Sequence, residues 1–124
     1  MITPGKIKVL VVNDEKVIRD FLTRFLNLKG IDVKAVEDGL QAIEIVKQEE
    51  FDLVFAEIKM RKMDGLEVFR EVKKLRPEIK FIITSAYAPQ EMLEQVKQEG
   101  VIACISNPFD IEELVMIVKE LHLL

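Results

Sequence analysis

The sequence is poor in the residues that support several kinds of chemistry. It has one cysteine, one histidine and no tryptophan in 124 residues. The single cysteine, Cys104, excludes an intrachain disulfide and a cysteine metal cluster, and its apolar neighbours predict a buried small hydrophobic residue. Because the only histidine lies near the C-terminal end, no histidine base can be placed beside Ser85. We therefore interpret Ser85 as a hydrogen-bonding residue rather than a nucleophile.

Clustered positive charge and long apolar segments are missing as well. The formal net charge is -4, whereas affinity for phosphate backbones comes from clustered Lys and Arg. No apolar stretch approaches the length of about 18 residues that spans a bilayer, and the first residues do not have the architecture of a signal peptide. We expect no nucleic-acid partner, no membrane partner and a cytoplasmic location.

What the sequence does contain is the composition of a folded globular protein. Hydrophobic residues make up 49% and charged residues 32%, without a low-complexity tract or a run of like charges. A chain of this length suffices for one hydrophobic core and is too short for a separate catalytic or DNA-binding module. We expect residues 1–124 to form a single domain.

The apolar pattern predicts a parallel α/β fold. Short continuous apolar runs alternate with longer stretches of helical spacing, which is typical of βαβ units. Four runs predict strands that helices cover on both faces, at 7–12, 53–56, 81–84 and 102–105. The segment 31–36 alternates between apolar and polar residues, which favours an edge strand. Right-handed crossovers then predict a doubly wound, three-layer α/β sandwich.

The helical stretches contain apolar stripes that we expect to face the sheet. In the first stretch the stripe comprises Val17, Ile18, Phe21, Leu22, Phe25 and Leu26, and Gly30 is suited to end the helix. The second is expected to use Leu40, Ile43 and Val46, and the last Ile111, Leu114, Val115, Val118 and Leu121. On the last helix Met116 lies about opposite this stripe and Ile117 lies at its flank, so both are expected near the surface.

Polar residues follow four of the predicted strands. In a doubly wound sheet, ligands bind at the carboxyl ends of the strands. The residues at these ends form the candidate site, and they are Asn13, Asp14, Glu57, Ser85 and Asn107.

Four segments carry a resemblance to a known family. They read VLVVNDEKVIRDFL, FDLVFAEIKMRKMDGLEVF, FIITSAY and ISNPFDIEEL, and they span essentially the whole chain. In order and spacing the chain resembles response-regulator receiver domains, most of all the single-domain phosphorelay receivers. The resemblance implies a flavodoxin-like (βα)5 fold with sheet order 2-1-3-4-5 and a role in two-component or phosphorelay signalling. It also implies signalling partners: a histidine kinase, a phosphotransferase or an effector.

The chain departs from the family at the residues that carry phosphate chemistry. Receivers have two acids after the first strand that hold Mg²⁺, an acceptor aspartate after the third, a Thr or Ser after the fourth, and a lysine before Pro-Phe. Here Asn13, Glu57 and Asn107 replace one acid, the aspartate and the lysine, whereas Asp14 and Ser85 match. The extra methylene of glutamate moves its carboxylate by about 1.5 Å, and misplacement on the order of 1 Å can cost about a hundredfold in rate.

The leading hypothesis is therefore a non-enzymatic pseudo-receiver with a degenerate pocket, which acts through protein–protein interaction without normal aspartyl phosphorylation. The alternative is a receiver intermediate that still takes phosphate from a histidine kinase or phosphotransferase. A third hypothesis, a flavin or nucleotide enzyme, is disfavoured because residues 13–16 lack the Gly, Ser and Thr that surround a phosphate. Glu57 either imitates a phosphorylated aspartate or is inert.

Two features of the candidate site stay open in the sequence. No cofactor is required, but Asp14 and Glu57, with Lys59, form a weak candidate site for Mg²⁺. The loop with Lys59, Arg61 and Lys62 either places a cation over Glu57 or is solvated.

The resemblance adds two further expectations. Receivers commonly dimerise or bind partners through the face of the fourth helix, fifth strand and last helix. In this chain that interaction face comprises Met92, Cys104, Met116 and Ile117. The Asn107–Pro108 peptide bond is expected to be cis, as the corresponding bond is in receivers.

Overall fold

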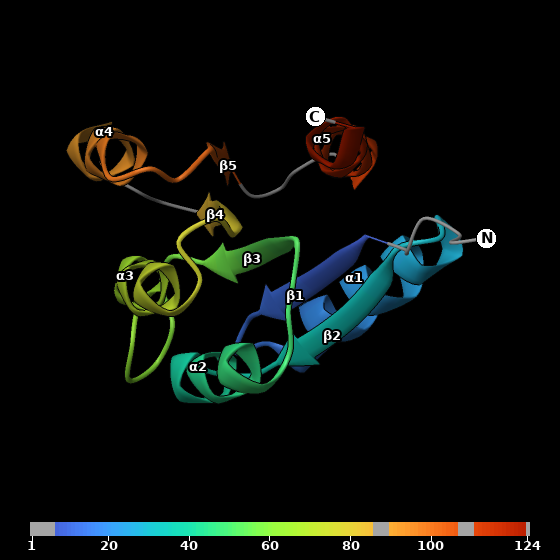
Figure 1. The fold of residues 1–124 in the computed structure, drawn as a ribbon, viewed down its shortest axis with the longest axis horizontal. Coiled ribbons are helices and arrows are strands. Elements are labelled where there is room, and N and C mark those ends of the chain that lie inside the picture. The colour runs from blue at the N-terminus through green and yellow to red at the C-terminus, as the bar shows by residue number, and fades with distance from the viewer. Residues whose placement is uncertain (1–6, 86–89, 107–110, 124) are drawn as a thin grey trace.

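The computed structural model describes residues 7–85, 90–106 and 111–123, with side chains left undescribed at 106, 111, 122 and 123. Strands and helices alternate along the chain (Figure 1). The strands are β1 (Lys8–Val12), β2 (Asp32–Val36), β3 (Leu53–Glu57), β4 (Lys80–Ser85) and β5 (Ala103–Ser106). The helices are α1 (Lys16–Leu28), α2 (Gly39–Gln48), α3 (Gly65–Leu75), α4 (Gln90–Gln98) and α5 (Ile111–Leu123).

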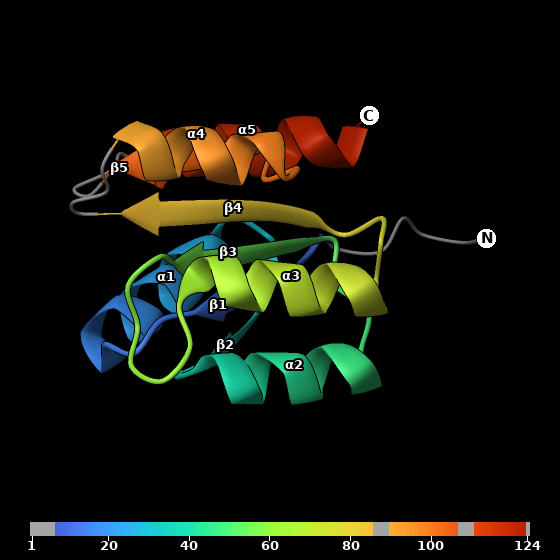
Figure 2. The same cartoon turned by 90° about the vertical axis from the view of Figure 1, so that its left-hand side faces the viewer.

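All five strands are parallel, and their order in the sheet is β2-β1-β3-β4-β5. This confirms the predicted sheet order, with the predicted edge strand at one side. The carboxyl ends of β3 and β4 lie at the left in Figure 2. Polar residues that follow neighbouring strands therefore gather at one end of the sheet.

Two hydrophobic clusters bury the two faces of the sheet. One joins alternate strand residues to α2, α3 and α4, with Val46, Val72 and Val96 as examples of the helical contribution. The other joins the intervening strand residues to α1 and α5, and Leu22 and Leu114 belong to it. The three-layer sandwich predicted from the sequence is confirmed.

The predicted stripe of α1 was too wide. Leu22 and Leu26 are buried, as expected, but Val17 and Phe21 are 79% and 52% exposed. A helix that packs on a sheet buries only the arc that faces it, so apolar residues beyond that arc lie in water. The prediction that Val17 and Phe21 face the sheet was therefore wrong.

Two further apolar residues are more exposed than their patterns predicted. Leu40, in the first turn of α2, is 54% exposed, and Ile102, just before β5, is 43% exposed. Both lie at the end of an element, where the neighbouring layer no longer covers the chain. In α5 the buried residues are Leu114, Val115 and Val118, as predicted. In the described part of the chain no helix has the length and apolar character needed to span a membrane.

Candidate functional site

The described strand-end residues lie close to one another because their strands are neighbours. Asn13 follows β1, Glu57 ends β3 and Ser85 ends β4, and these three strands are adjacent in the sheet. Asn13 and Ser85 are each 5% exposed, and Glu57 is half-buried. Asn107, together with the predicted cis bond that follows it, lies outside the described residues.

The side chain of Asn13 shapes the loop after β1. Its Oδ1 accepts a hydrogen bond from the backbone N–H of Glu15 at 2.9 Å, an arrangement that turns the chain locally. Its carbonyl oxygen accepts a hydrogen bond from Nη1 of Arg19 at 2.7 Å, and its N–H donates to the carbonyl of Val36 at 3.1 Å. Asn13 is therefore held by three contacts, two of them through its backbone.

Glu57 has a partner that the sequence did not indicate. Oγ1 of Thr84 donates a hydrogen bond to Oε2 of Glu57 at 2.9 Å. The two residues are directly paired in the register of β3 and β4, so their side chains leave the same face of the sheet. Thr84 is 2% exposed, and the hydroxyl is a buried donor to a carboxylate.

The neighbouring hydroxyl, Ser85, is arranged differently. Its Oγ is buried and has no hydrogen-bond partner. Because side chains alternate along a strand, Ser85 leaves the face opposite to that of Thr84. Of the two hydroxyl residues at the end of β4, the one that we predicted to belong to the pocket, Ser85, is not the one that contacts Glu57. The sequence alone could not identify Thr84 as the partner of Glu57, because that requires the register of β3 and β4.

The loop between β3 and α3 is held tightly against Glu57. The N–H of Ile58 donates to the carbonyl of Thr84 and the N–H of Gly65 donates to the carbonyl of Ile58, both at 2.8 Å. A Cβ atom at Gly65 would lie 2.6 Å from the carbonyl oxygen of Glu57. Asp64 caps α3 by accepting from the N–H of Glu67 at 2.8 Å in a reciprocal capping box.

The basic part of this loop lies beside Asp14. Arg61 and Lys62 line a hollow of about 160 Å³ together with Asp14, Glu37 and Asp38. Lys59, Arg61 and Lys62 are all exposed, and within the described residues no ion pair joins any of them to Glu57. Two of these three basic side chains, Arg61 and Lys62, therefore lie beside a hollow that is also lined by acidic residues, Asp14 among them.

A cation would find few ligands among the described side chains. No group of three or more His, Cys, Asp or Glu side chains that could hold a metal ion occurs within residues 7–85, 90–106 and 111–123. Of the two predicted acidic ligands, Asp14 lines the hollow and Glu57 is bonded to Thr84. These residues fit a tightly held Mg²⁺ poorly, although Mg²⁺ often uses only one or two carboxylates and several waters.

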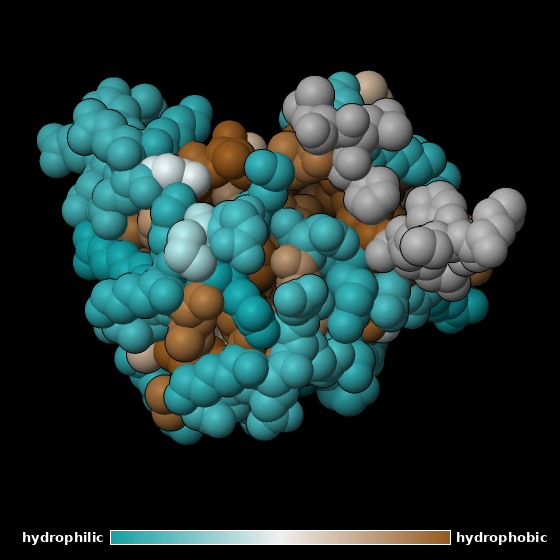
Figure 3. All heavy atoms as spheres, viewed as in Figure 1, coloured by the Kyte–Doolittle hydropathy of each residue, from teal (hydrophilic) through white to brown (hydrophobic). Residues whose placement is uncertain are grey.

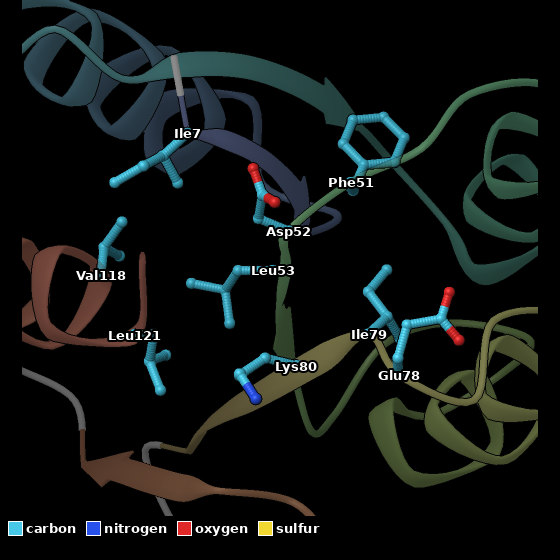
Figure 4. A pocket seen from close by; sticks show the side chains of 9 residues that line it. All are labelled: Ile7, Phe51, Asp52, Leu53, Glu78, Ile79, Lys80, Val118 and Leu121. Atoms are coloured by element: carbon cyan, nitrogen blue, oxygen red, sulfur yellow. The ribbon is translucent and has the colours of Figure 1, made fainter. Parts of the chain in front are cut away.

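A larger hollow lies at the other end of the sheet, where β3 and β4 begin. Its volume is about 350 Å³, and Ile7, Leu53, Val118 and Leu121 point toward its interior (Figure 4). Oδ2 of Asp52, on its rim, accepts the N–H of Lys8 at 2.8 Å. Because the amino ends of the strands form this hollow, it is separate from the candidate site.

The predicted interaction face contains exposed and half-buried residues. Met116 is 62% exposed, and Met92, Cys104 and Ile117 are half-buried against the core clusters. Burial raises the pKa of the Cys104 thiol, so that thiol is not activated as a nucleophile. The expected exposure of Met116 is confirmed, and the role of this face in partner binding stays a prediction.

A second exposed apolar surface lies on α1. Val17, Phe21 and Leu28 are 79%, 52% and 76% exposed. With about 100° per residue these three positions fall within about 40° of one another. We call this row the α1 stripe. On the face drawn in Figure 3, hydrophilic side chains cover most of the surface, with smaller hydrophobic patches among them.

The fold and the site together define a class of protein. A doubly wound sheet of order 2-1-3-4-5, with acidic and hydroxyl residues at its carboxyl end, is the architecture of flavodoxin-like signalling domains. The family model of the response regulator receiver domain matches residues 9–119, and the chain therefore belongs to this family. Receiver domains act in two-component and phosphorelay signalling, with partners among kinases and phosphotransferases.

Curated relatives differ in how much of their length the chain covers. It is 35% identical to sporulation initiation phosphotransferase F of Bacillus subtilis over 113 residues, which is 91% of each chain. It is 33% identical to the sensor kinase CckA of Brucella abortus, but spans only 13% of that protein. It spans 26% of the transcriptional regulatory protein ZraR of Klebsiella oxytoca at 31% identity.

Solved receiver structures share the fold. A CheY-like receiver domain protein from Methanospirillum hungatei is 28% identical, with a TM-score of 0.89 over 94% of this chain and 93% of the other. A response regulator from Burkholderia pseudomallei, which contains a phosphorylated aspartic acid and a calcium ion, is 19% identical with a TM-score of 0.83 over 94% of this chain and 71% of the other.

Proposed function

We propose that this receiver is not an enzyme and transmits its signal by binding partners, without normal aspartyl phosphorylation. The observation that carries the proposal is the hydrogen bond between Thr84 and Glu57. It engages the carboxylate that stands at the acceptor position. A nucleophilic carboxylate has to reach the phosphorus atom in line with the leaving group, and displacement on the order of 1 Å can cost about a hundredfold in rate.

The residues around Glu57 support the same proposal. Phosphoryl transfer depends on cations that neutralise the developing charge. In this chain Asn107 replaces the lysine that the family uses, and Asn13 replaces one of the metal-binding acids. Asn13 instead uses its side-chain oxygen to turn the loop toward Glu15. The fixed negative charge of Glu57 then either imitates a phosphorylated state or is inert, and in both cases the output depends on partner binding.

Two exposed apolar surfaces are suited to such partners. The α1 stripe presents Val17, Phe21 and Leu28 to solvent, and the α5 surface presents Met116. Apolar residues that cluster at the surface are typical of protein interaction sites. We assign partner recognition to these two surfaces rather than to the charged hollow beside Asp14.

The second candidate function is phosphoryl acceptance. The observation that favours it is the 35% identity with sporulation initiation phosphotransferase F across 91% of both chains. In that case Glu57 would form an acyl phosphate, take its phosphoryl group from a kinase or phosphotransferase, and use Asp14 with a divalent cation. The relatives favour this function, whereas the residues of the pocket favour the first.

Intact-mass spectrometry after incubation with Mg²⁺ and acetyl phosphate separates the two functions. We expect no mass change in the wild-type protein. The triple variant Glu57→Asp, Asn13→Asp and Asn107→Lys rebuilds the family pocket and serves as the positive control. The variant Glu57→Asp alone is expected to gain little. Stoichiometric addition of one phosphoryl group to the wild type, absent in Glu57→Gln, would establish the second function and refute the first.

A further inference from the structure

The end of β4 carries two consecutive hydroxyl residues with opposite surroundings. Thr84 is 2% exposed and donates to Glu57, whereas Ser85 is 5% exposed and its Oγ has no partner. The burial of the two residues is nearly the same. Their difference comes from the face of the sheet that each side chain leaves, because only Thr84 shares a face with Glu57.

The register of β3 and β4 makes the contact possible, because it pairs Glu57 directly with Thr84. Neighbouring strands lie about 4.8 Å apart, and directly paired residues have Cβ atoms roughly 5 Å apart. A carboxylate and a hydroxyl on two such residues can meet across the strands, and Oε2 of Glu57 lies 2.9 Å from Oγ1 of Thr84. The contact joins the carboxyl ends of β3 and β4.

We propose that Thr84 is a positioning residue that keeps the Glu57 carboxylate on β4 and thereby lowers the affinity of the pocket for divalent cations. The hydroxyl and a cation compete for the same carboxylate oxygen. Asp14 follows β1, which is next to β3 in the sheet, so it lies at the neighbouring strand end and is the acid that we expect to share a cation with a released Glu57. The proposal deepens the proposed function and rests on it only for the position of Glu57 in the pocket.

The test is a titration with Mn²⁺, followed by water-proton relaxation, with Mg²⁺ as competitor. Thr84→Val removes the hydroxyl at nearly constant volume, and we expect Mn²⁺ to bind about tenfold more tightly, because a hydrogen bond to a charged acceptor is worth roughly that factor or more. Thr84→Ser keeps a hydroxyl and is expected to behave as the wild type. Ser85→Ala removes the neighbouring hydroxyl and is expected to leave the affinity unchanged.

Two further measurements fix the interpretation. Adding Glu57→Gln to Thr84→Val is expected to abolish the gain, because the released ligand is gone. The ¹³C carboxyl resonance of Glu57 is expected to shift in Thr84→Val and not in Ser85→Ala, which reports the hydrogen bond without any metal. If Thr84→Val and the wild type bind Mn²⁺ equally, or if Ser85→Ala gives the same gain, the proposal is overturned.

The outcome for the proposed function is separate. Phosphorylation of the wild-type protein by acetyl phosphate would refute that function and leave the role of Thr84 to be decided by the Mn²⁺ titration. If Thr84→Val binds Mn²⁺ with the affinity of the wild type, the proposed role of Thr84 is refuted. The proposal that the protein is not phosphorylated would be unaffected by that result.

Discussion

Replacing Gly65 with alanine tests how rigidly the structure fixes Glu57. The new Cβ atom would lie 2.6 Å from the carbonyl oxygen of Glu57 and 3.0 Å from Cα of Ile58. Both neighbours are backbone atoms at the end of β3, which is paired with β1 and β4 on its two sides. The strand cannot retreat, so α3 has to move away from it by several tenths of an ångström. That movement loosens the contacts of Leu66 and other buried residues at the start of α3.

The expected cost follows from this geometry. Extra methyl groups in a packed region destabilise by about 1–3 kcal/mol. Alanine is a better helix former than glycine by up to about 1 kcal/mol, which offsets part of that cost. We therefore expect Gly65→Ala to lower the free energy of unfolding by about 1–2 kcal/mol. With an m-value of about 1–3 kcal/mol/M in urea, the unfolding midpoint falls by roughly 0.3–2 M.

Urea unfolding followed by far-UV circular dichroism measures this change, because the chain has no tryptophan to report by fluorescence. Lys74→Ala on the same helix is the matched control. The Lys74 side chain is 73% exposed and makes an ion pair with Glu71, so its loss should stay within about 0.5 kcal/mol. Equal unfolding midpoints for Gly65→Ala and Lys74→Ala would show that α3 can shift at little cost. The close approach of Gly65 to the backbone of Glu57 would then not fix the position of Glu57.

Helix capping, an ion pair and the α5 surface can each be tested by substitution. Asp64→Ala removes the capping box of α3 and is expected to cost about 1 kcal/mol in urea unfolding, with Asp64→Asn losing less. The hydrogen bond from Lys8 is the main cause of the lowered pKa of Glu49. The ionised Glu49 therefore stabilises the folded state above the pKa that Glu49 has in the unfolded chain, and this contribution is lost as the pH falls through its folded pKa. In Glu49→Gln the melting temperature should therefore fall less steeply below about pH 5 than in the wild type. An equally steep fall in both proteins would contradict this. Met116→Glu is expected to leave the melting temperature nearly unchanged, because Met116 is exposed. Ile117→Glu is expected to lower it, because Ile117 is half-buried. Equal melting temperatures of the two variants would contradict this difference in burial.

The sequence was sufficient for the fold because the sheet is buried on both faces. Continuous apolar runs then have one interpretation as covered parallel strands, and the alternating segment 31–36 was correctly expected at the edge. Helical stripes were less informative. A periodic pattern contains the buried arc but does not give its width, and Val17 and Phe21 were assigned to the core although they face solvent.

The candidate site was predictable only as a set of positions. Strand-end polarity indicated Asn13, Glu57 and Ser85, because the carboxyl ends of parallel strands meet at one edge. Thr84 was missed because, as part of a buried strand, it was taken for a core residue. Its hydroxyl becomes meaningful only once the register pairs it with Glu57. A one-residue shift of β4 would have placed Ser85 there instead, and no property of the local sequence excludes that shift.

This dependence on register means that the backbone decides which hydroxyl meets Glu57. The backbone around the acceptor position is fixed by strand pairing, by the close approach of Gly65 and by the turn at Asn13. Within that frame the Glu57 carboxylate lies within hydrogen-bond distance of Thr84 on the neighbouring strand. The register of two strands thereby places a buried hydroxyl of the protein itself against the Glu57 carboxylate.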